Sequence, residues 1–293
     1  MPHGLDHIVH AVRDLDAAAA FYGRAGFTVG SRNRHPWGTH NRIVQLKNCY
    51  VEILEVAEPD QIVPHGARSF SFGAFNRDFL SRREGFSMLL LNSRNAVQDA
   101  RAFEAAGISN FEVFDFAREG KRPDGTEVKL AFSLAFAADP ASPDLRFAVC
   151  QHHFPENFWN PAFQVHANGA MYVPGAAMVA NHPSDHRSFL KAYTGTSEMI
   201  SNAQGATTHT ENGDIEILEP HAASDQFGLP VKASGEGMTL NAMRVAVADL
   251  KQTEALHRQN GLAVLRHAGR LIVPPIEAFG ATLIFEVAKA KVG

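Results

Sequence analysis

The chain has few cysteines, few polar aromatic residues and no block of positive charge. Its 293 residues include 2 Cys, 4 Tyr and 2 Trp. The two cysteines, Cys49 and Cys150, do not make a disulfide framework, so we expect a reducing, cytoplasmic environment. The net charge is -4 and no run of Lys or Arg stands out. We therefore expect no nucleic-acid partner, because such proteins need basic clusters that neutralise phosphates.

Long apolar runs and common catalytic motifs are also missing. The longest apolar stretches, such as residues 88–91 and 130–136, are far shorter than a membrane span. The N-terminus leads directly into strand-like sequence and shows no signal-peptide pattern. No phosphate-binding glycine loop, serine-hydrolase elbow or Cys-x-x-Cys pair occurs. We therefore expect no membrane partner and no chemistry of these three types.

Phenylalanine, by contrast, is abundant, with 21 residues. Apolar residues make up 45% and charged residues 20% of the chain, which is typical of a globular protein. Rings without polar groups suit a plain hydrophobic core, which is the simpler interpretation, or an apolar ligand pocket.

Four segments of the chain repeat the order of a short apolar strand, a helix and further strands. We expect the opening strands at residues 5–12, 86–91, 175–180 and 241–247. We expect the helices at residues 17–24, 96–106, 184–193 and 250–260. The closing strands are expected at residues 50–56, 145–152, 214–218 and 282–287. The sequence VEILEV at residues 51–56 returns as IEILEP at residues 215–220, which supports true repetition.

This order predicts an α+β fold of four βαβββ modules, paired into two half-open mixed-sheet barrels. The turn-rich segment 154–161 indicates a linker near the midpoint. We therefore predict an N-terminal domain at residues 1–160, with modules 1 and 2, and a C-terminal domain at residues 161–293, with modules 3 and 4. A concave barrel interior is where a ligand site is expected.

The first module resembles a known family. Residues 6–12 (DHIVHAV), followed by residues 14–16 (DLD) and 21–22 (FY), resemble the opening of glyoxalase-type modules. Residues 35–41 (HPWGTHN), leading into the strands up to residue 54, are similar to the glyoxalase-like domain family. That family lies within the vicinal oxygen chelate (glyoxalase/bleomycin resistance/dioxygenase) superfamily. The resemblance implies a divalent metal inside the barrel, held by the first and last strands of the modules, although some members have lost it.

His7 and Glu52 match the first-strand and last-strand ligand positions of such a module. A carboxylate inside a barrel is costly unless it is paired or bound to a metal. An imidazole with a carboxylate suits zinc, iron, manganese or nickel. Alternatively, Glu52 is only hydrogen-bonded to a buried His7 or to an arginine.

A third ligand is sought at the end of module 2. On the expected strand, Gln151 and His153 share one face and His152 lies on the other. We predict His153, or alternatively His152, as the third metal ligand, and His153 with Glu52 as catalytic groups that move a proton. Gln151 and His152 are predicted to bind substrate. The alternative is that these histidines only cap the loop beside Pro155.

Two polar turns flank these strands. His35 and Asn41 lie on a Pro/Gly turn and are predicted to bind substrate at the rim of the barrel, unless the turn is only solvated. Arg118, Lys121 and Arg122 surround a turn at residues 123–125 and are interpreted as surface charge on a hairpin tip.

The second half offers few metal ligands. Ala242 and Gly175 stand at its first-strand ligand positions, and Glu216 has no imidazole partner. Any metal is therefore expected in the N-terminal half, which weakens the analogy with ring-cleaving dioxygenases.

The sequence thus predicts a metal-dependent enzyme of lyase or isomerase type that acts on a small substrate with vicinal oxygens. A metal-free small-molecule binding protein of the same fold is the first alternative, and an extradiol-type dioxygenase is the second. A homodimer, or a dimer-forming role for one half, is left open.

Overall fold

The structure, a computed structural model, is a mixed α+β fold built from four βαβββ modules, as the sequence predicts. It describes residues 2–121, 125–233, 235 and 237–289. Module 1 comprises β1 (Leu5–Ala11), α1 (Leu15–Arg24), β2 (Asn33–Arg34), β3 (Thr39–Gln45) and β4 (Tyr50–Val56). Module 2 comprises β5 (Gly85–Asn92), α3 (Ala96–Ala105), β6 (Phe114–Lys121), β7 (Glu127–Ala137) and β8 (Arg146–His152).

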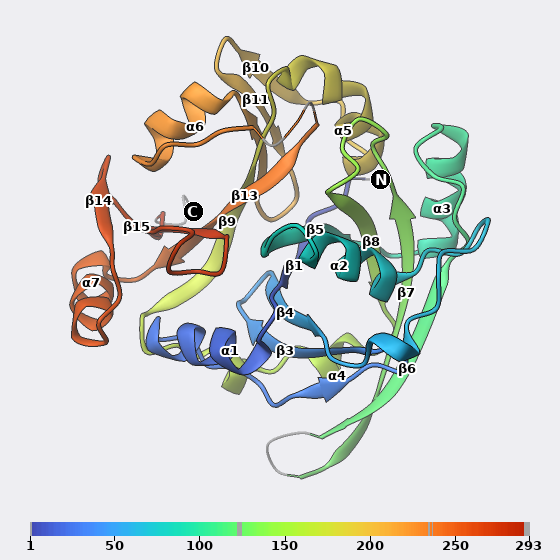
Figure 1. Cartoon of the computed structure of the whole chain (residues 1–293), viewed down its shortest axis with the longest axis horizontal. Coiled ribbons are helices and arrows are strands. Elements are labelled where there is room, and N and C mark those ends of the chain that lie inside the picture. The colour runs from blue at the N-terminus through green and yellow to red at the C-terminus, as the bar shows by residue number, and fades with distance from the viewer. Residues whose placement is uncertain (1, 122–124, 234, 236, 290–293) are drawn as a thin grey trace.

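The second half repeats this order. Module 3 comprises β9 (Ala170–Val179), α5 (Arg187–Thr194), β10 (Met199–Asn202), β11 (Gly205–His209) and β12 (Asp214–Leu218). Module 4 comprises β13 (Thr239–Val247), α7 (Leu250–Gln259), β14 (Leu265–His267), β15 (Arg270–Val273) and β16 (Thr282–Val287). Figure 1 shows the first half, in blue and green, beside the second half, in yellow to red.

The strand order makes each half a curved, open sheet. In every module the first strand pairs in parallel with the last: β1 with β4, β5 with β8, β9 with β12 and β13 with β16. Antiparallel pairs β1–β5 and β9–β13 then join two modules into a half. The halves meet where Leu240 of β13 pairs with Phe86 of β5. The parallel pairs matter for function, because they place the first and last strands of a module side by side.

The crossover helices begin at the capping residues that the sequence contains. Asp14, Asn95 and Asp249 each accept a hydrogen bond from a backbone N–H in the first turn of α1, α3 and α7. Helix α5 ends at Gly195, whose φ of 69° suits a glycine. None of the helices in the described part of the chain has the length and apolar character to cross a membrane.

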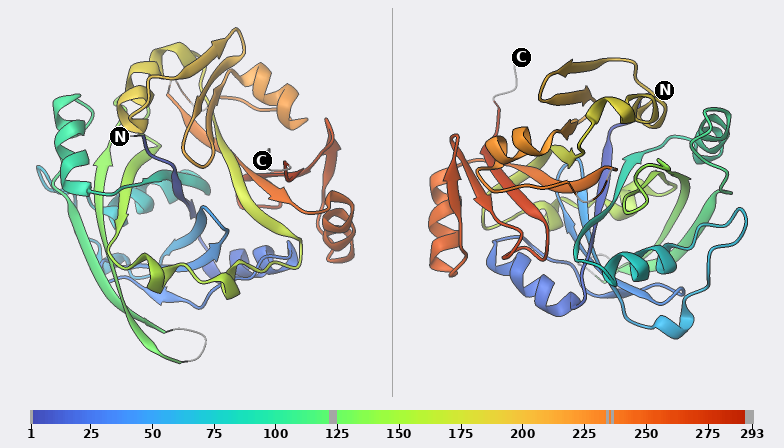
Figure 2. Two further views of the ribbon diagram at one scale, coloured as in Figure 1. Left: turned by 180° about the vertical axis from the view of Figure 1, so that it is seen from behind. Right: turned by 45° about the horizontal axis from the view of Figure 1, so that its top comes forward.

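Several elements were not expected from the sequence. Helices α2 (Phe72–Leu80) and α6 (Pro220–Phe227) follow the first and third modules, and short 3-10 turns η1 (Pro59–Gln61) and η3 (Pro183–His186) precede α2 and α5. The expected linker contains α4 (Pro155–Phe158) and leads to η2 (Pro161–Gln164). The division into domains at residues 160 and 161 stays a prediction. Strands β6 and β7 form a long hairpin that projects from the first half (Figure 2).

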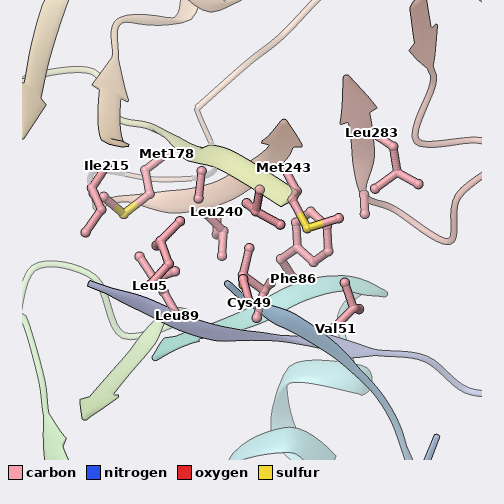
Figure 3. Packing of buried hydrophobic residues seen from close by; sticks show 14 of the residues in the cluster. Leu5, Cys49, Val51, Phe86, Leu89, Met178, Ile215, Leu240, Met243 and Leu283 are labelled. Atoms are coloured by element: carbon pink, nitrogen blue, oxygen red, sulfur yellow. The ribbon is translucent and has the colours of Figure 1, made fainter. Parts of the chain in front are cut away.

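The main hydrophobic core lies between the two halves. Figure 3 shows Leu5, Phe86 and Leu89 of the first half facing Met178 and Met243 of the second. All of these side chains are at most 1% exposed. Because one continuous cluster draws on all four modules, each half depends on the other to bury its outer sheet face.

Buried polar side chains also tie the halves together. The Asn212 side chain accepts a hydrogen bond from the backbone N–H of Leu5 and donates one to its carbonyl. Tyr193 donates to the carbonyl oxygens of Leu89 and Ala148, at 2.7 and 2.9 Å. His10 Nε2 lies 3.0 Å from the carbonyl of Phe279, which accepts its proton. These contacts fix the register between the modules as well as their distance.

His10 makes stability depend on pH. Burial lowers its pKa from 6.5 to about 4, against the smaller opposing effect of the Phe279 hydrogen bond. Below pH 6.5 the unfolded chain therefore binds a proton that the folded protein does not, and stability falls as the pH is lowered towards 4. We expect His10 to account for a loss of about 3 kcal/mol in the free energy of unfolding over this range.

The check is urea unfolding of wild type and His10→Gln at pH 7 and pH 4.5. Glutamine keeps a donor and an acceptor but does not titrate, so the variant should lose less stability on acidification. Equal losses in the two proteins would show that His10 is not responsible.

Candidate functional site

The concave face of the first half encloses a small chamber with polar groups on one side. We call this the inner chamber; it has a volume of about 70 Å³. Four polar residues on that side are His7 from β1, His35 from the β2–β3 turn, Asn41 from β3 and Glu52 from β4. All four are buried. The parallel pairing of β1 with β4 thus brings the predicted pair, His7 and Glu52, into one cavity.

His7 and Glu52 face each other across a short gap. Nε2 of His7 lies 3.9 Å from a carboxylate oxygen, Oε2, of Glu52. The ring of His7 also stacks on Tyr50, with centroids 4.3 Å apart and an interplanar angle of 13°. Stacking and burial hold the imidazole in place, so packing as well as hydrogen bonding directs Nε2 of His7 towards Glu52.

Asp6 orients His7 from behind. The pairing of β1 with β5 shifts register between Leu5 and His7, which makes Asp6 the extra residue of a bulge. Asp6 Oδ1 therefore reaches Nδ1 of its neighbour His7, at 2.5 Å. Burial raises the pKa of Asp6, but pairing with His152 and His7 outweighs it and keeps the pKa below its ordinary value. In a neutral His7, an ionised Asp6 holds the ring proton on Nδ1, and the lone pair on Nε2 then faces Glu52.

Asn41 and His35 hold the other oxygen of Glu52. Nδ2 of Asn41 donates to Glu52 Oε1 at 2.5 Å and lies 3.2 Å from Nε2 of His35. Nδ1 of His35 lies 2.8 Å from the Thr39 hydroxyl. Burial lowers the pKa of His35, with smaller and opposing effects of neighbouring charges. The two predicted substrate-binding residues thus lie in the cavity, where they position the carboxylate.

Aromatic rings form much of the rest of the inner chamber. They come from β4, β6, β7, α2, α4 and the turn after His35: Trp37, Tyr50, Phe72, Phe114, Phe116, Phe132 and Phe158. Trp37 stacks on His35 with centroids 4.6 Å apart. Part of the phenylalanine excess therefore lines a pocket, whereas the sequence favoured a plain core as the simpler interpretation.

A larger cavity of about 450 Å³ adjoins the inner chamber, and we call it the outer chamber. Ile43, Arg118 and Phe158 border both. The interpretation of Arg118 as surface charge on a hairpin tip is wrong, because strand alternation puts it on the same face of β6 as Phe114 and Phe116. The Lys121 side chain and residues 122–124 lie outside the described part of the structure.

The structure does not bring the residues at the end of module 2 into the inner chamber. His153 is exposed and lies 2.8 Å from the hydroxyl of Ser133. Gln151 accepts a hydrogen bond from the backbone N–H of Ala96 at the start of α3. His152 lies on the other strand face and is mostly buried, and its Nε2 lies 3.0 Å from Asp6 Oδ2. His152 therefore holds Asp6, and Asp6 in turn holds His7.

Cys150 was not predicted as part of the site, yet it borders the inner chamber. Ligand atoms of Asp6, His7 and Cys150 all lie within 4.8 Å of one another. Burial, followed by the charges of Asp6 and Glu52, raises the pKa of the Cys150 thiol well above its ordinary value. One sequence signal indicates that Cys150 belongs to the site: it shares a strand face with His152. A lone cysteine in an apolar strand otherwise indicates a core residue.

The donor set fits a divalent metal. Two ligands bound to one ion at about 2.0–2.2 Å can be at most about 4.4 Å apart, and the 3.9 Å between His7 and Glu52 is within that limit. A carboxylate on the far nitrogen of a ligating histidine, as Asp6 is here, is the usual support for metal-bound imidazole. Among the described residues, no Lys or Arg lies within 4.0 Å of the Glu52 carboxylate.

The second half gives its matching carboxylate a fixed cation instead. Glu216 pairs with Ala177 in β12–β9 as Glu52 pairs with Val9 in β4–β1, so the two glutamates are equivalent. By the same register Gly175 takes the place of His7. Nη1 of Arg244 lies 2.8 Å from Glu216 Oε1, and a Cβ on Gly175 would approach Nη2 to 3.0 Å.

This arrangement explains why the second half lacks an imidazole. Arg244 lies opposite Gly175 in β13–β9, whereas the residue opposite His7 is the apolar Leu90. The guanidinium also reaches Asp214 Oδ2 at 3.0 Å. The buried carboxylate is therefore paired with an arginine in the second half, whereas in the first half no described Lys or Arg lies within 4.0 Å of it.

Removing Arg244 should destabilise the fold. Arg244→Met leaves Glu216 buried without a cation, and we expect a loss of about 3–5 kcal/mol in the free energy of unfolding. Adding Glu216→Gln should restore part of it. Arg68→Met, which breaks an exposed pair with Glu104, is the control and should cost less than about 1 kcal/mol. A loss of the control's size for Arg244→Met would contradict this role.

Comparisons with known proteins agree with this architecture. The model of the glyoxalase-like domain family matches residues 5–194, which cover modules 1 and 2 and the beginning of module 3. No curated protein sequence matches the chain.

Solved structures resemble the whole chain. A hypothetical protein from Staphylococcus aureus has a TM-score of 0.68 at 12% identity, over 98% of this chain and 100% of that one. A mutant of 4-hydroxymandelate synthase from Streptomyces coelicolor has a TM-score of 0.58 at 11% identity, over 99% and 94%. The 2,2',3-trihydroxybiphenyl 1,2-dioxygenase from Sphingomonas wittichii has a TM-score of 0.51 at 10% identity, over 98% and 91%. At these identities the likeness concerns the fold, and it confirms the predicted four-module architecture.

Proposed function

Since the chain belongs to the glyoxalase-like domain family, we propose that its inner chamber is the metal centre of an enzyme acting on a small substrate with vicinal oxygens. His7 and Glu52 hold the ion, and the reaction is of lyase or isomerase type. The observation that carries this proposal is the buried Glu52, which faces the free nitrogen of His7 at 3.9 Å and has no described Lys or Arg within 4.0 Å.

The ion would act as a Lewis acid that stabilises negative charge on a substrate oxygen. Asp6 keeps the His7 proton on Nδ1 and so keeps Nε2 available as a donor atom. Asn41 holds Oε1 of Glu52, which leaves Oε2 directed towards His7. The aromatic rings restrict water in the chamber, which strengthens every electrostatic interaction there.

In this proposal, residues inside the chamber carry out the proton transfer. His153 is exposed and bonded to Ser133, so it is not carried into the mechanism. Nε2 of His35 lies 3.9 Å from Glu52 Oε1 and borders the same cavity. We assign His35 and Glu52 as the groups able to accept a proton from bound substrate.

One observation favours the metal-free alternative. The chamber is narrow and mostly aromatic, as a site that only binds an apolar ligand would be. The dioxygenase alternative is supported by the printed name of one structural neighbour, the 2,2',3-trihydroxybiphenyl 1,2-dioxygenase, whose likeness to this chain concerns the fold. Metal content separates the binding protein from both enzymes.

We expect protein purified without chelator to contain about one divalent ion per chain. His7→Ala and Glu52→Gln should lose most of it, because each removes a donor atom. Inductively coupled plasma mass spectrometry on matched samples measures this. His153→Ala is the control and should keep its metal; wild-type protein without metal would overturn the proposal.

A companion variant decides between two donor sets. Cys150→Ser should keep its metal if Glu52 completes the site with His7. Loss of metal from Cys150→Ser, with retention in Glu52→Gln, would place the ion instead among Asp6, His7 and Cys150.

Asp6 should affect affinity without binding the ion. Asp6→Asn removes the carboxylate that orients His7, and we expect metal affinity to fall about 10- to 100-fold. Competition with a chromophoric chelator measures the affinity. Asp16→Asn, an exposed carboxylate on α1, is the matched control. Unchanged affinity in Asp6→Asn would remove Asp6 from the site.

A further inference from the structure

Arg118 lies at the boundary between the two chambers, and no carboxylate of the described residues is paired with it. Among the residues that the structure describes, none offers a carboxylate oxygen within 4.0 Å of its guanidinium, and its one hydrogen bond is to the backbone carbonyl of Glu119, at 3.3 Å. The side chain is partly buried and lines the inner chamber, as do Phe116 and Phe158. Burial lowers its pKa, which indicates that the charge is poorly solvated.

Other buried or partly buried arginines have partners of two kinds: Arg83 and Arg146 lie over phenylalanine rings, whereas Arg32 and Arg244 pair with carboxylates. The partly buried Arg32 contacts Glu55 and Asp16, and the buried Arg244 contacts Glu216 and Asp214. An arginine that borders a cavity without such a partner is a ready binding group for an anion, since guanidinium matches a carboxylate in shape and charge.

A second donor in the cavity is also unsatisfied. The indole N–H of Trp37 is buried and has no hydrogen-bond acceptor among the described residues. Trp37 lines the inner chamber and contacts Phe116 edge to face, with ring centroids 4.9 Å apart. The walls of the chamber therefore supply donors without acceptors, which favours a ligand that carries acceptor oxygens.

We propose that the substrate is a small organic acid whose carboxylate pairs with Arg118 at the boundary between the chambers. This inference rests on the proposed function, because it takes the inner chamber as the reacting site. The inner chamber, at about 70 Å³, holds only the reacting end of a molecule. The remainder of the acid lies in the outer chamber of about 450 Å³, among side chains that include Asn33 and Gln45.

The charged residues that border the chambers place the carboxylate at Arg118, because Glu52 borders the inner chamber and Glu119 and Glu127 border the outer one. Glu52 lies deep in the inner chamber, and a carboxylate placed beside it would be repelled unless a metal lay between them. Arg118 offers the acid a position nearer the outer chamber, where solvent reaches both groups. A neutral ligand of the same shape would leave the guanidinium unpaired, so Arg118 acts as a specificity determinant for acids over their amides.

The test compares acids with their primary amides: lactate with lactamide, benzoate with benzamide, and phenylacetate with phenylacetamide. Ligand-observed NMR titrations on the protein as purified give the affinities. We expect at least one acid to bind about 10-fold or more tightly than its amide, and Arg118→Gln to abolish that preference. Arg118→Lys should keep part of it.

The matched control is Arg101→Gln, an exposed arginine on α3, which should keep the full preference. No acid binding better than its amide, or a preference that survives Arg118→Gln, would overturn the proposal. Metal content is measured on the same samples. Metal without an acid preference overturns this inference alone, whereas an acid preference in metal-free protein overturns the proposed metal centre and leaves the acid site standing.

Discussion

The buried carboxylate of Glu52 is the constraint around which the first half is organised. A carboxylate inside a sheet of apolar residues must be neutralised or fully hydrogen-bonded. Asn41 satisfies one of its oxygens, and the other faces His7. Asp6 in turn holds His7, and His152 holds Asp6. This chain of contacts ends at the carboxylate, where a cation would complete it.

The two halves solve the same electrostatic problem differently. Each half has a buried glutamate at the same register position: Glu52 in β4, the last strand of module 1, and Glu216 in β12, the last strand of module 3. In the second half Arg244 neutralises it permanently, with Gly175 making room for the guanidinium. The repeated fold thus provides an internal reference. In the second half the protein supplies the cation for the buried glutamate, whereas in the first half no described Lys or Arg lies within 4.0 Å of it.

Much of the fold could be predicted from the sequence, because strand–helix–strand order and capping residues are local signals. The pair His7 and Glu52 could be predicted because parallel first and last strands bring fixed register positions together. Asp6 could not, since strand alternation places it opposite His7 and only a bulge reverses this. Arg118 was misinterpreted because the hairpin's curvature over the cavity depends on the tertiary packing of its phenylalanines. His153 was expected inside, but the strand ends at His152.

The most direct test of the central claim is anomalous diffraction from crystals of the chelator-free protein, recorded at the absorption edges of manganese, iron, nickel and zinc. Our account predicts one strong peak in the gap between Nε2 of His7 and Oε2 of Glu52. A peak elsewhere in the chain, or a water at that point in crystals soaked with each metal, would contradict it.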